Sequence, residues 1–531
     1  MDKLKLSLIP ISTGLVLLLY SWASSYPVSI TSTYDFGYNH FSYLYWISLP
    51  MLLASFFIVA MKTKNHALRW VMAVSTVLLI FSQTYFYYTI PTSDANLFLG
   101  LTENFIATGN LGSPNFRQSY YQWPLFFVMN KMMVLATGID LRIAGFILYA
   151  LIGSIITSFL YFLLFKVQEN AYVAVVAFFI ILTWFVNFQF WAPFALSLCF
   201  TLVLFYLDHL PRKREVTVAM LVIFGSITFT HILTPLFFVV YSLIMHLIYR
   251  SRKHRSLFVL TSIVYVLVLM WNVNLNHYIE QALNLTSGSL LGQIEVTMTG
   301  TVAQQPYVDL IAQLLSRTGV VATILLTGFG FILLYRRKKL SKMNYAMLIT
   351  GGIFAATFLI GPANYNEITS RSLFLICLPA SLGASFLCES KFRKYFTTVF
   401  LILLVLFTFS LMHKTFFDRQ VFFLTKQEYN CANFVVETTN WNVSTTFLTD
   451  FRLNEYLGAK SLSVVVRLES DVSSPNFYED ISSYDNVIYT VGLAKSFYAL
   501  GLSPAESFEE FNKNDFNLIY NSGEYTCVFQ K

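Results

Sequence analysis

Two acidic side chains lie in the first part of residues 91–140, a long polar segment between two apolar stretches. Asp94 stands near its start, in Ser93-Asp94-Ala95-Asn96, and Glu103 follows in the same helical pattern. A carboxylate that reaches a reacting group can act as its general base. An aspartate before a helix can equally be the N-cap of that helix, and a glutamate on a helix surface can simply face water. The residue types alone leave both interpretations open.

Two basic side chains away from the main basic clusters could bind an anion. Arg371 follows the polar stretch 362–370 at the end of an apolar segment, and a guanidinium binds phosphate through two parallel hydrogen bonds. His231 lies at a helix break, in His231-Ile232-Leu233-Thr234-Pro235, and could contact phosphate or a sugar. The alternatives are an arginine that reaches toward lipid headgroups and a histidine that is an ordinary interfacial residue.

Aromatic residues gather later in the same polar segment, in Tyr120-Tyr121-Gln122-Trp123-Pro124, shortly after Arg117. Arg117, Tyr120, Tyr121 and Trp123 could line a sugar pocket, because the C–H faces of sugars stack on aromatic rings. Tyrosine and tryptophan also collect at membrane–water interfaces without any ligand. For these aromatic residues the interfacial explanation is the simpler one.

The composition sets the class of protein. Of the 531 residues, 56% are hydrophobic, 17% aromatic and only 12% charged. A soluble domain needs more charge to cover its surface, so the chain is predicted to be an integral membrane protein. The net charge of +7 then belongs to loops beside a membrane, and no nucleic-acid partner is expected.

Apolar runs of the length of membrane helices recur along the chain. They occur near residues 7–24, 41–61, 70–90, 141–165, 172–187, 191–208, 218–230, 235–249, 256–271, 319–335, 344–361, 372–388 and 396–413. These runs predict about 13 crossings, all helical, because lipid cannot satisfy exposed backbone amides. The first run follows Lys3 and Lys5 like a signal peptide and is expected to remain as an anchor.

Basic residues predict the orientation, because cytoplasmic loops carry an excess of lysine and arginine. One set of loops holds most of them: Lys3, Lys5, Lys62, Lys64, Arg69, Lys166, 212–214, Arg250, Arg252, Lys253, Arg255, 336–339, Lys342, Lys391, Arg393 and Lys394. The opposite loops before residue 414 hold only Arg117, Lys131, Arg142, Arg317 and Arg371. We therefore expect a multi-pass protein of the cell (plasma) membrane with a cytoplasmic N-terminus.

The same rule requires an even number of crossings in 172–208 and in 218–249. Each stretch has basic clusters at both of its ends, and the rule places both clusters on the cytoplasmic side of the membrane. We expect the breaks at Asn187–Pro193 and at Thr230–Pro235, where proline and polar residues interrupt the helices. Both turns then face outward. This division makes several of the helices short for a membrane span.

Two long loops, 91–140 and 272–318, are expected on the same outer face. Within 91–140 the spacing predicts an interfacial helix that begins at Asp94 and has an apolar face. That face comprises Leu97, Phe98, Leu101 and Phe105, and Asn96, Gly100, Glu103 and Asn104 turn away from it. A second amphipathic helix is predicted over Leu125–Leu135.

The composition changes at Lys414, after which charged residues reach an ordinary frequency. Short β-rich runs alternate there with helical stretches: Lys426–Glu437, Thr445–Thr449, Ser463–Arg467, Val487–Val491, Pro504–Asn512 and Asn517–Tyr520. We therefore predict a transmembrane domain over 1–413 and a small extracytoplasmic α/β domain over 414–531. Cys431 and Cys527 flank that region and could form a disulfide or remain two thiols.

The pattern resembles the GT-C superfamily of membrane glycosyltransferases, especially its protein mannosyltransferase and aminoarabinose transferase branch. The resemblance rests on Asp94 early in an external loop, on Thr108-Gly109-Asn110, on the motif 120–124, on the outward turn 231–235 and on the C-terminal domain. Two features depart from the family. The acidic loop follows the third crossing rather than the first, and Glu103 replaces a clear pair of carboxylates.

The resemblance implies an enzyme that moves a sugar from a dolichyl- or undecaprenyl-phosphate donor to a hydroxyl or amide of a lipid, glycan or protein acceptor. It implies Asp94 as the base and Glu103 as a residue that orients the acceptor or a metal. Arg371 and His231 would then bind the lipid phosphate, and Arg117 and the aromatics would bind the sugar. No cofactor is certain, although Mg²⁺ or Mn²⁺ could stabilise the leaving phosphate.

Three other functions remain open from the sequence: a transporter or flippase of lipid-linked saccharides, a polysaccharide polymerase or ligase, and a membrane scaffold. A transporter is expected to show internal repeats and charged or interrupted helices at the middle of the bilayer. The polar residues here cluster instead at the outer ends of the apolar runs. This distribution favours a reaction at the membrane surface.

Overall fold

The computed structural model describes most of the helical part of the chain and short pieces of the remainder. The described residues are 3–27, 41–90, 93–109, 121, 123–166, 170–185, 190–211, 213–250, 252–271, 307–338, 340–360, 366–390, 393–417, 425–438, 447–449, 456–457, 465–467, 486–489, 517–521 and 527–530. The predicted external loop 272–318 and the predicted helix Pro504–Asn512 fall wholly or largely outside them.

Each predicted apolar run overlaps a helix, so the helical prediction is confirmed, with one difference at residues 70–90. The bundle comprises α1 (Lys3–Ser25), α2 (Tyr43–Lys62), α3 (His66–Ile80), α6 (Leu141–Phe165), α7 (Ala171–Phe185), α8 (Pro193–Asp208), α9 (Arg214–Thr228), α10 (Leu233–Tyr249), α11 (Arg252–Trp271), α14 (Tyr307–Arg336), α15 (Lys342–Ile360), α16 (Asn366–Glu389) and α17 (Arg393–Phe417). The breaks between α7 and α8 and between α9 and α10 lie at the two proline-containing turns, as predicted.

The predicted run 70–90 is not one helix, which corrects the sequence-based expectation. Helix α3 ends at Ile80, and a 3₁₀ turn, η1 (Ser82–Phe86), follows it. The hydroxyls of Ser82 and Thr84 contact those of Tyr45 at 3.1 Å and Tyr149 at 3.3 Å. Ser82 and Thr84 are buried, and their contacts with α2 and α6 hold this turn inside the bundle.

Four helices among the described residues are both long and apolar enough to cross a membrane. They are Leu8–Ser25, Tyr43–Lys62, Leu141–Phe165 and Arg371–Glu389, and shorter apolar helices accompany them. The multiple apolar helices establish the integral membrane class. The number of crossings stays a prediction.

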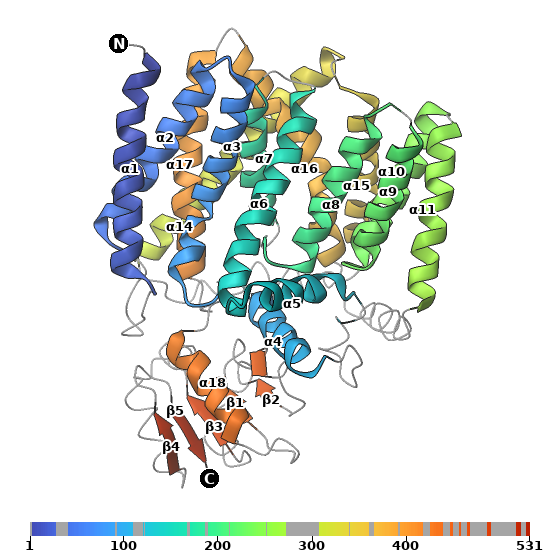
Figure 1. Ribbon diagram of the computed structural model, residues 1–531. Coiled ribbons are helices and arrows are strands. Elements are labelled where there is room, and N and C mark those ends of the chain that lie inside the picture. Colours follow the sequence, from blue (N-terminus) through green and yellow to red (C-terminus); the bar gives the residue numbers. More distant parts are fainter. Residues whose placement is uncertain are drawn as a thin grey trace.

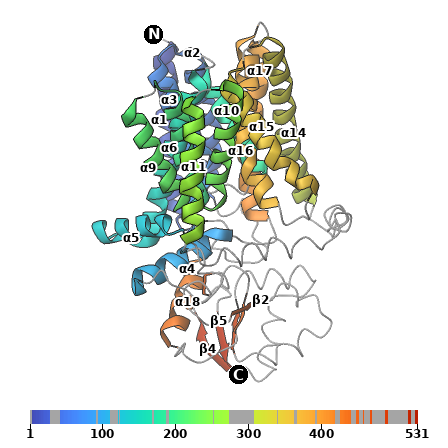
Figure 2. The same cartoon turned by 90° about the vertical axis from the view of Figure 1, so that its right-hand side faces the viewer.

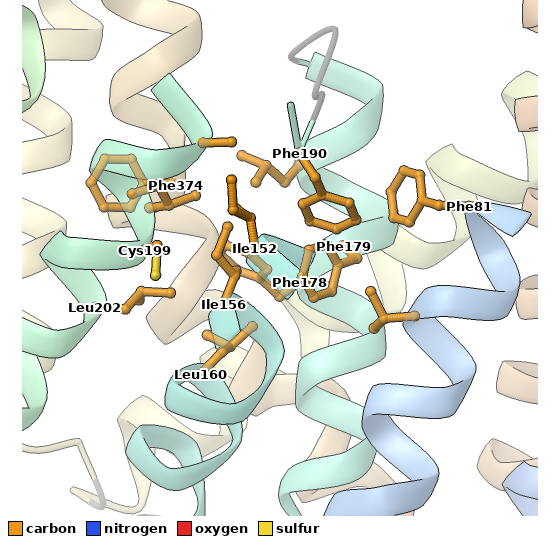
Figure 3. Packing of buried hydrophobic residues seen from close by; sticks show 14 of the residues in the cluster. Phe81, Ile152, Ile156, Leu160, Phe178, Phe179, Phe190, Cys199, Leu202 and Phe374 are labelled. Atoms are coloured by element: carbon orange, nitrogen blue, oxygen red, sulfur yellow. The ribbon is translucent and has the colours of Figure 1, made fainter. Parts of the chain in front are cut away.

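The middle of the bundle is a densely packed aromatic core. Figure 3 shows Phe81, Phe179 and Phe190 close together, with Ile152 and Ile156 of α6 and Cys199 of α8 nearby. Phe81 and Phe190 meet edge to face, with ring centroids 4.8 Å apart. Helix α7 is buried on every side from Ala171 to Thr183, as expected of a helix that is apolar all round.

Helices α14 and α16 approach so closely at two glycines that no side chain fits between them. A Cβ atom on Gly330 would overlap the carbonyl oxygen of Gly383, and one on Gly383 would overlap the carbonyl oxygen of Thr327. Small residues at such a crossing allow two backbones to make extensive van der Waals contact within a membrane. This crossing sets the position of α16, the helix that carries Arg371.

Two further helices, α4 (Ser93–Thr108) and α5 (Leu125–Thr137), lie across one end of the bundle. Figures 1 and 2 both show helix α18 (Lys426–Thr438) beyond α4, at that same end. The two chain ends lie at opposite ends of the molecule (Figure 1). The loop helices α4 and α5 therefore lie at the same end of the bundle as the C-terminal segment. The even number of crossings predicted for 172–208 and for 218–249 (the even-crossing argument) requires this arrangement.

The short strands of the C-terminal segment form one mixed sheet. The strands are β1 (Phe447–Thr449), β2 (Val465–Arg467), β3 (Asn486–Tyr489), β4 (Asn517–Asn521) and β5 (Cys527–Gln530), in the spatial order β2-β1-β3-β5-β4. β1 pairs in parallel with β2 and β3, whereas β5 pairs antiparallel with β3 and β4. Each predicted β-rich run overlaps a strand, and β5 was not predicted. The domain boundary at 413/414 stays a prediction, and α17 runs on to Phe417.

Candidate functional site

Asp94 is the second residue of α4, in the first turn of the helix. Helix α4 buries Leu97, Leu101 and Phe105, which confirms the predicted apolar face. Asn96, which was expected to turn away from that face, is also fully buried. Helix α4 contacts α5, α6 and, through Glu103, the C-terminal segment, so it has more than one buried side. The side chain of Asp94 itself lies outside the described part of the structure.

Helix α5 joins α4 to the α9–α10 turn and to the residues just before α8. The Lys131 ammonium donates to the carbonyl of Phe105 near the end of α4, over 3.1 Å. The Leu125 amide donates to the carbonyl of Phe229 in the α9–α10 turn, over 3.0 Å. Asn130 accepts a hydrogen bond of 3.0 Å from the indole N–H of Trp191, which lies just before α8. The predicted loop 91–140 is thus anchored beside the two turns that were expected to face the same way.

Arg371 and His231 meet at this end of the bundle, although they are 140 residues apart in the chain. Nη1 of Arg371, in α16, lies 3.4 Å from Nε2 of His231, in the α9–α10 turn. The Arg371 guanidinium also lies over the ring of Phe194 in α8, 4.9 Å from the ring centroid. Three different helix ends therefore contribute to one cluster, and two of its members were candidates from the sequence.

Two hydroxyls hold the His231 ring in place. Nδ1 of His231 lies 2.9 Å from Oγ1 of Thr234, and this oxygen lies 2.9 Å from Oγ of Ser197. The side chains of Thr234 and Ser197 are fully buried, in α10 and α8. Because the ring is held on its Nδ1 side, its Nε2 side remains directed at Arg371.

Burial and the nearby Arg371 cation lower the pKa of His231 well below its ordinary value of 6.5. The imidazole is therefore neutral at physiological pH. A guanidinium can only donate hydrogen bonds, and a protonated imidazolium cannot accept one, so the contact with Nη1 of Arg371 also favours a neutral ring. The cluster carries one positive charge, on the arginine, and this charge can attract an anion.

Glu103 contacts the C-terminal segment. One of its carboxylate oxygens accepts a hydrogen bond of 2.6 Å from the Tyr429 hydroxyl, in α18. The other oxygen accepts one of 2.6 Å from the hydroxyl of Tyr456, which is fully buried. The carboxylate therefore joins α4 to two distant parts of the chain, and this arrangement differs from an exposed, solvated glutamate.

Of the candidates in residues 117–124, the structure describes Tyr121 and Trp123. Tyr121 is buried, and its hydroxyl donates to the carbonyl of Leu101 in α4. Trp123 is buried as well, one residue before the Pro124 that precedes α5. Arg117 and Tyr120 lie outside the described residues, so their predicted contact with a sugar stays a prediction.

Metal and disulfide predictions remain open. Among the described residues, no three or more His, Cys, Asp and Glu side chains form a group that could hold a metal ion. The side chain of Asp94, the predicted base, is not part of that description. Cys431 is buried in α18, and the side chain of Cys527 lies outside the described part, as does any pairing between the two.

Sequence reasoning missed the residues that support the candidates. Thr234 lies inside the motif around His231. It follows His231 by three residues at the start of a helix, and this spacing could have predicted that the two side chains meet. Ser197, Phe194, Tyr429 and Tyr456 carry no local signal, because they meet their partners only through the packing of distant segments.

Comparisons with known proteins show the fold. No protein-family model matches the chain, and no curated protein matches it. Among solved structures, the Archaeoglobus fulgidus oligosaccharyltransferase in complex with Zn and sulfate is 12% identical, with a TM-score of 0.50 over 79% of this chain and 67% of that chain.

Two crystal structures of ArnT from Cupriavidus metallidurans also align along most of their length. The form bound to undecaprenyl phosphate is 11% identical, with a TM-score of 0.48 over 86% of this chain and 97% of that chain. The apo form is 10% identical, with a TM-score of 0.47 over 88% and 98%. Of these three structures, the oligosaccharyltransferase has a TM-score of 0.50, and at 12% identity that match shows the fold alone. The chain therefore shares the fold of the GT-C membrane glycosyltransferases.

Proposed function

We propose that this protein transfers a sugar from a polyprenyl-phosphate donor to a hydroxyl or amide of a lipid, glycan or protein acceptor. The donor would be a dolichyl or undecaprenyl phosphate carrying the sugar. The reaction would occur at the non-cytoplasmic face of the cell membrane, where the distribution of basic residues places α4, α5 and the C-terminal segment. The shared GT-C fold supports this class of reaction.

The observation that carries the proposal is the convergence of Arg371 and His231 beside the loop helices. The guanidinium is held near a neutral imidazole at 3.4 Å, at helix ends that α5 joins to α4 through backbone and side-chain hydrogen bonds. A cation at the surface end of an apolar bundle suits a ligand with a phosphate head and a hydrocarbon tail. A polyprenyl phosphate has this combination.

The proposed chemistry needs a base on one side of the sugar and a cation on the other. Asp94 would take the proton of the acceptor as its oxygen or nitrogen bonds to the anomeric carbon. The bond between that carbon and the phosphate oxygen breaks in the same step, and the electron pair stays on the phosphate. Arg371, with His231 beside it, would stabilise the added negative charge. Arg117, Tyr120, Tyr121 and Trp123 are proposed to contact the sugar.

A divalent cation is compatible with this scheme, in which Arg371 already supplies a positive charge for the leaving phosphate. If Asp94 binds Mg²⁺ or Mn²⁺, the ion would supply further stabilisation of the leaving phosphate. Residues 414–531 are proposed to form an extracytoplasmic α/β domain over the site. Transfer assays with and without a chelator address the need for a metal directly.

The test uses the full chain purified in lipid nanodiscs and a panel of radiolabelled polyprenyl-phosphate sugars. We expect transfer to an acceptor, or slow transfer to water, with release of polyprenyl phosphate. Asp94→Asn removes the base and is expected to lower the rate by about 100-fold or more, the size typical of general-base catalysis. Glu215→Gln provides a control, because Glu215 is exposed in the first turn of α9, at the other end of that helix from His231.

Two results would contradict the proposal. One is a wild-type protein that turns over none of the lipid-linked sugars. The other is an Asp94→Asn variant that transfers sugar at the wild-type rate. Transport of an intact lipid-linked saccharide across the bilayer, without release of polyprenyl phosphate, would favour the flippase alternative.

A further inference from the structure

The Glu103 carboxylate sits in a small cluster that joins segments far apart in the chain. Its partners Tyr429 and Tyr456 are 326 and 353 residues away. Both bonds measure 2.6 Å, which is short and typical of hydroxyl donors that bind an ionised carboxylate. Tyr456 has a second contact, 3.4 Å to Oδ1 of Asn433 in α18. We call Glu103, Tyr429 and Tyr456 the clasp.

The clasp is reinforced around the Tyr429 ring. The guanidinium of Arg142, at the start of α6, lies 4.8 Å from the centroid of that ring and 4.1 Å from the centroid of Tyr88. Asp140 pairs with the Arg142 side chain through bonds of 2.9 and 3.0 Å. The C-terminal segment therefore contacts both α4 and the bundle at this point, and α18 is held against each.

Helix α4 is fastened on two sides. On the bundle side, Tyr121 and Lys131 donate to backbone carbonyls of Leu101 and Phe105 in the second half of the helix. On the other side, Glu103 is bound by the two tyrosines of the clasp. The helix that carries Asp94 in its first turn is thus oriented partly by residues from the C-terminal segment.

The two tyrosines are suited to act only as hydrogen-bond donors. Burial, together with the negative charge of Glu103, raises the pKa of Tyr429 and of Tyr456. Both hydroxyls therefore keep their protons at neutral pH and donate to the carboxylate. Removal of the carboxylate would leave the hydroxyls of the fully buried Tyr456 and the partly buried Tyr429 without this partner, which is costly for a hydroxyl that water cannot reach.

We propose that the clasp positions α4, and that Glu103 is a positioning residue rather than a second acid in the reaction. This inference rests on the proposed function for its effect on catalysis. The C-terminal segment would then control the rate of transfer by holding Asp94 at the reacting group. Binding of the donor phosphate, through Arg371 and His231, would not depend on the clasp.

The experiment compares three variants of the full chain in nanodiscs: Glu103→Ala, Glu103→Gln and the double variant Tyr429→Phe with Tyr456→Phe. Hydrogen–deuterium exchange of the α4 amides measures its positioning directly, and steady-state transfer gives kcat and KM. Tyr172→Phe is the matched control, because Tyr172 is buried and its hydroxyl bonds to Thr76 at 2.9 Å in the bundle. The Tyr172→Phe variant also loses a hydrogen bond of a tyrosine hydroxyl, but this bond joins α7 to α3 and does not involve α4.

We expect Glu103→Ala and the double tyrosine variant to behave alike. Both should speed exchange in α4 and lower kcat about 10- to 100-fold, the effect of a small misplacement of a reacting group, with KM for the donor changed less than about twofold. Glu103→Gln keeps the side-chain length and an amide oxygen that accepts from a tyrosine. It should therefore retain most of the wild-type kcat and exchange rate, as should Tyr172→Phe.

A Glu103→Gln variant as inactive as Glu103→Ala, with unchanged exchange in α4, would overturn the inference, because it would show a chemical role for the acid. Unchanged exchange in the double tyrosine variant would overturn it too. If the wild-type chain transfers no sugar, the proposed function fails, and the exchange measurements still decide whether the clasp positions α4.

Discussion

At the scale of single residues, the structure defines both the orientation and the charge of the pair Arg371 and His231. The imidazole is fixed by Thr234 and Ser197 and kept neutral by burial and by the arginine. The sequence predicted both members of the pair from their types and from their places at helix ends. Their meeting could not be predicted, because it depends on how α16 packs against the α9–α10 turn.

The lowered pKa of His231 makes stability depend on pH. Between the folded pKa and the ordinary value of 6.5, the unfolded chain binds a proton that the folded chain does not bind. Stability is therefore lost as the pH falls below about 6.5, and it is fully present above that value. In His231→Gln this contribution disappears, so the free energy of unfolding should fall less on acidification, by up to about 1.4 kcal/mol per pH unit.

The measurement is the thermal midpoint of detergent-solubilised protein from pH 7.5 to 5.0. His209→Gln is the control, because His209 is exposed at the end of α8, and it should follow the wild-type curve. Parallel curves for wild type and His231→Gln would show that the folded His231 titrates normally.

At the scale of helices, the sequence predicted where the helices lie along the chain better than it predicted which segments pack against them. Apolar length and the positions of proline were enough to place the bundle helices and the breaks before α8 and α10, because lipid demands helical backbone throughout a span. The amphipathic pattern also predicted α4 and α5. It failed for Asn96, which is fully buried, because a pattern within one helix cannot reveal how many sides of that helix other segments cover.

The crossing of α14 and α16 gives a prediction about packing. Gly330→Ala would place a methyl group against the backbone of Gly383, and a backbone cannot move aside as a flexible side chain can. We expect a loss of about 1–3 kcal/mol of stability, as for other overpacked sites. Gly328→Ala is the matched control in the same helix, because no atom lies within 4 Å of its added Cβ.

The thermal midpoint in detergent again provides the measurement for the two alanine variants. Gly330→Ala should melt below the wild type, and Gly328→Ala should melt at or slightly above it, since alanine favours helix over glycine. Equal midpoints for the two variants would mean that the helices are not in contact at Gly330.

At the scale of the whole molecule, helices α4 and α5, the α9–α10 turn and the C-terminal segment lie together at one end of the bundle (Figure 1). The even-crossing argument predicted this grouping from the basic residues alone. The sequence could not predict the clasp, because Tyr429 and Tyr456 resemble any other tyrosines until α18 lies beside α4. Which end faces the cytoplasm stays a prediction.

Labelling of intact cells tests that orientation. Thr137 is exposed at the end of α5, and Lys213 is exposed just before α9. A membrane-impermeant thiol reagent should modify Thr137→Cys in intact cells and Lys213→Cys only after the membrane is permeabilised. The reverse pattern would place the candidate site in the cytoplasm and contradict the proposed topology.

The central claim is that Arg371 binds the phosphate of a polyprenyl carrier, and binding of a polyprenyl phosphate to purified protein in nanodiscs tests it most directly. Loss of charge-assisted hydrogen bonds worth about 1.5–3 kcal/mol should raise the Kd about 10- to 100-fold in Arg371→Ala. Arg371→Lys should bind with intermediate affinity, because lysine keeps the charge but not the paired donors. The account predicts that wild type prefers the phosphate to the corresponding polyprenol and that Arg371→Ala does not. Equal affinity of wild type and Arg371→Ala for the phosphate would contradict it.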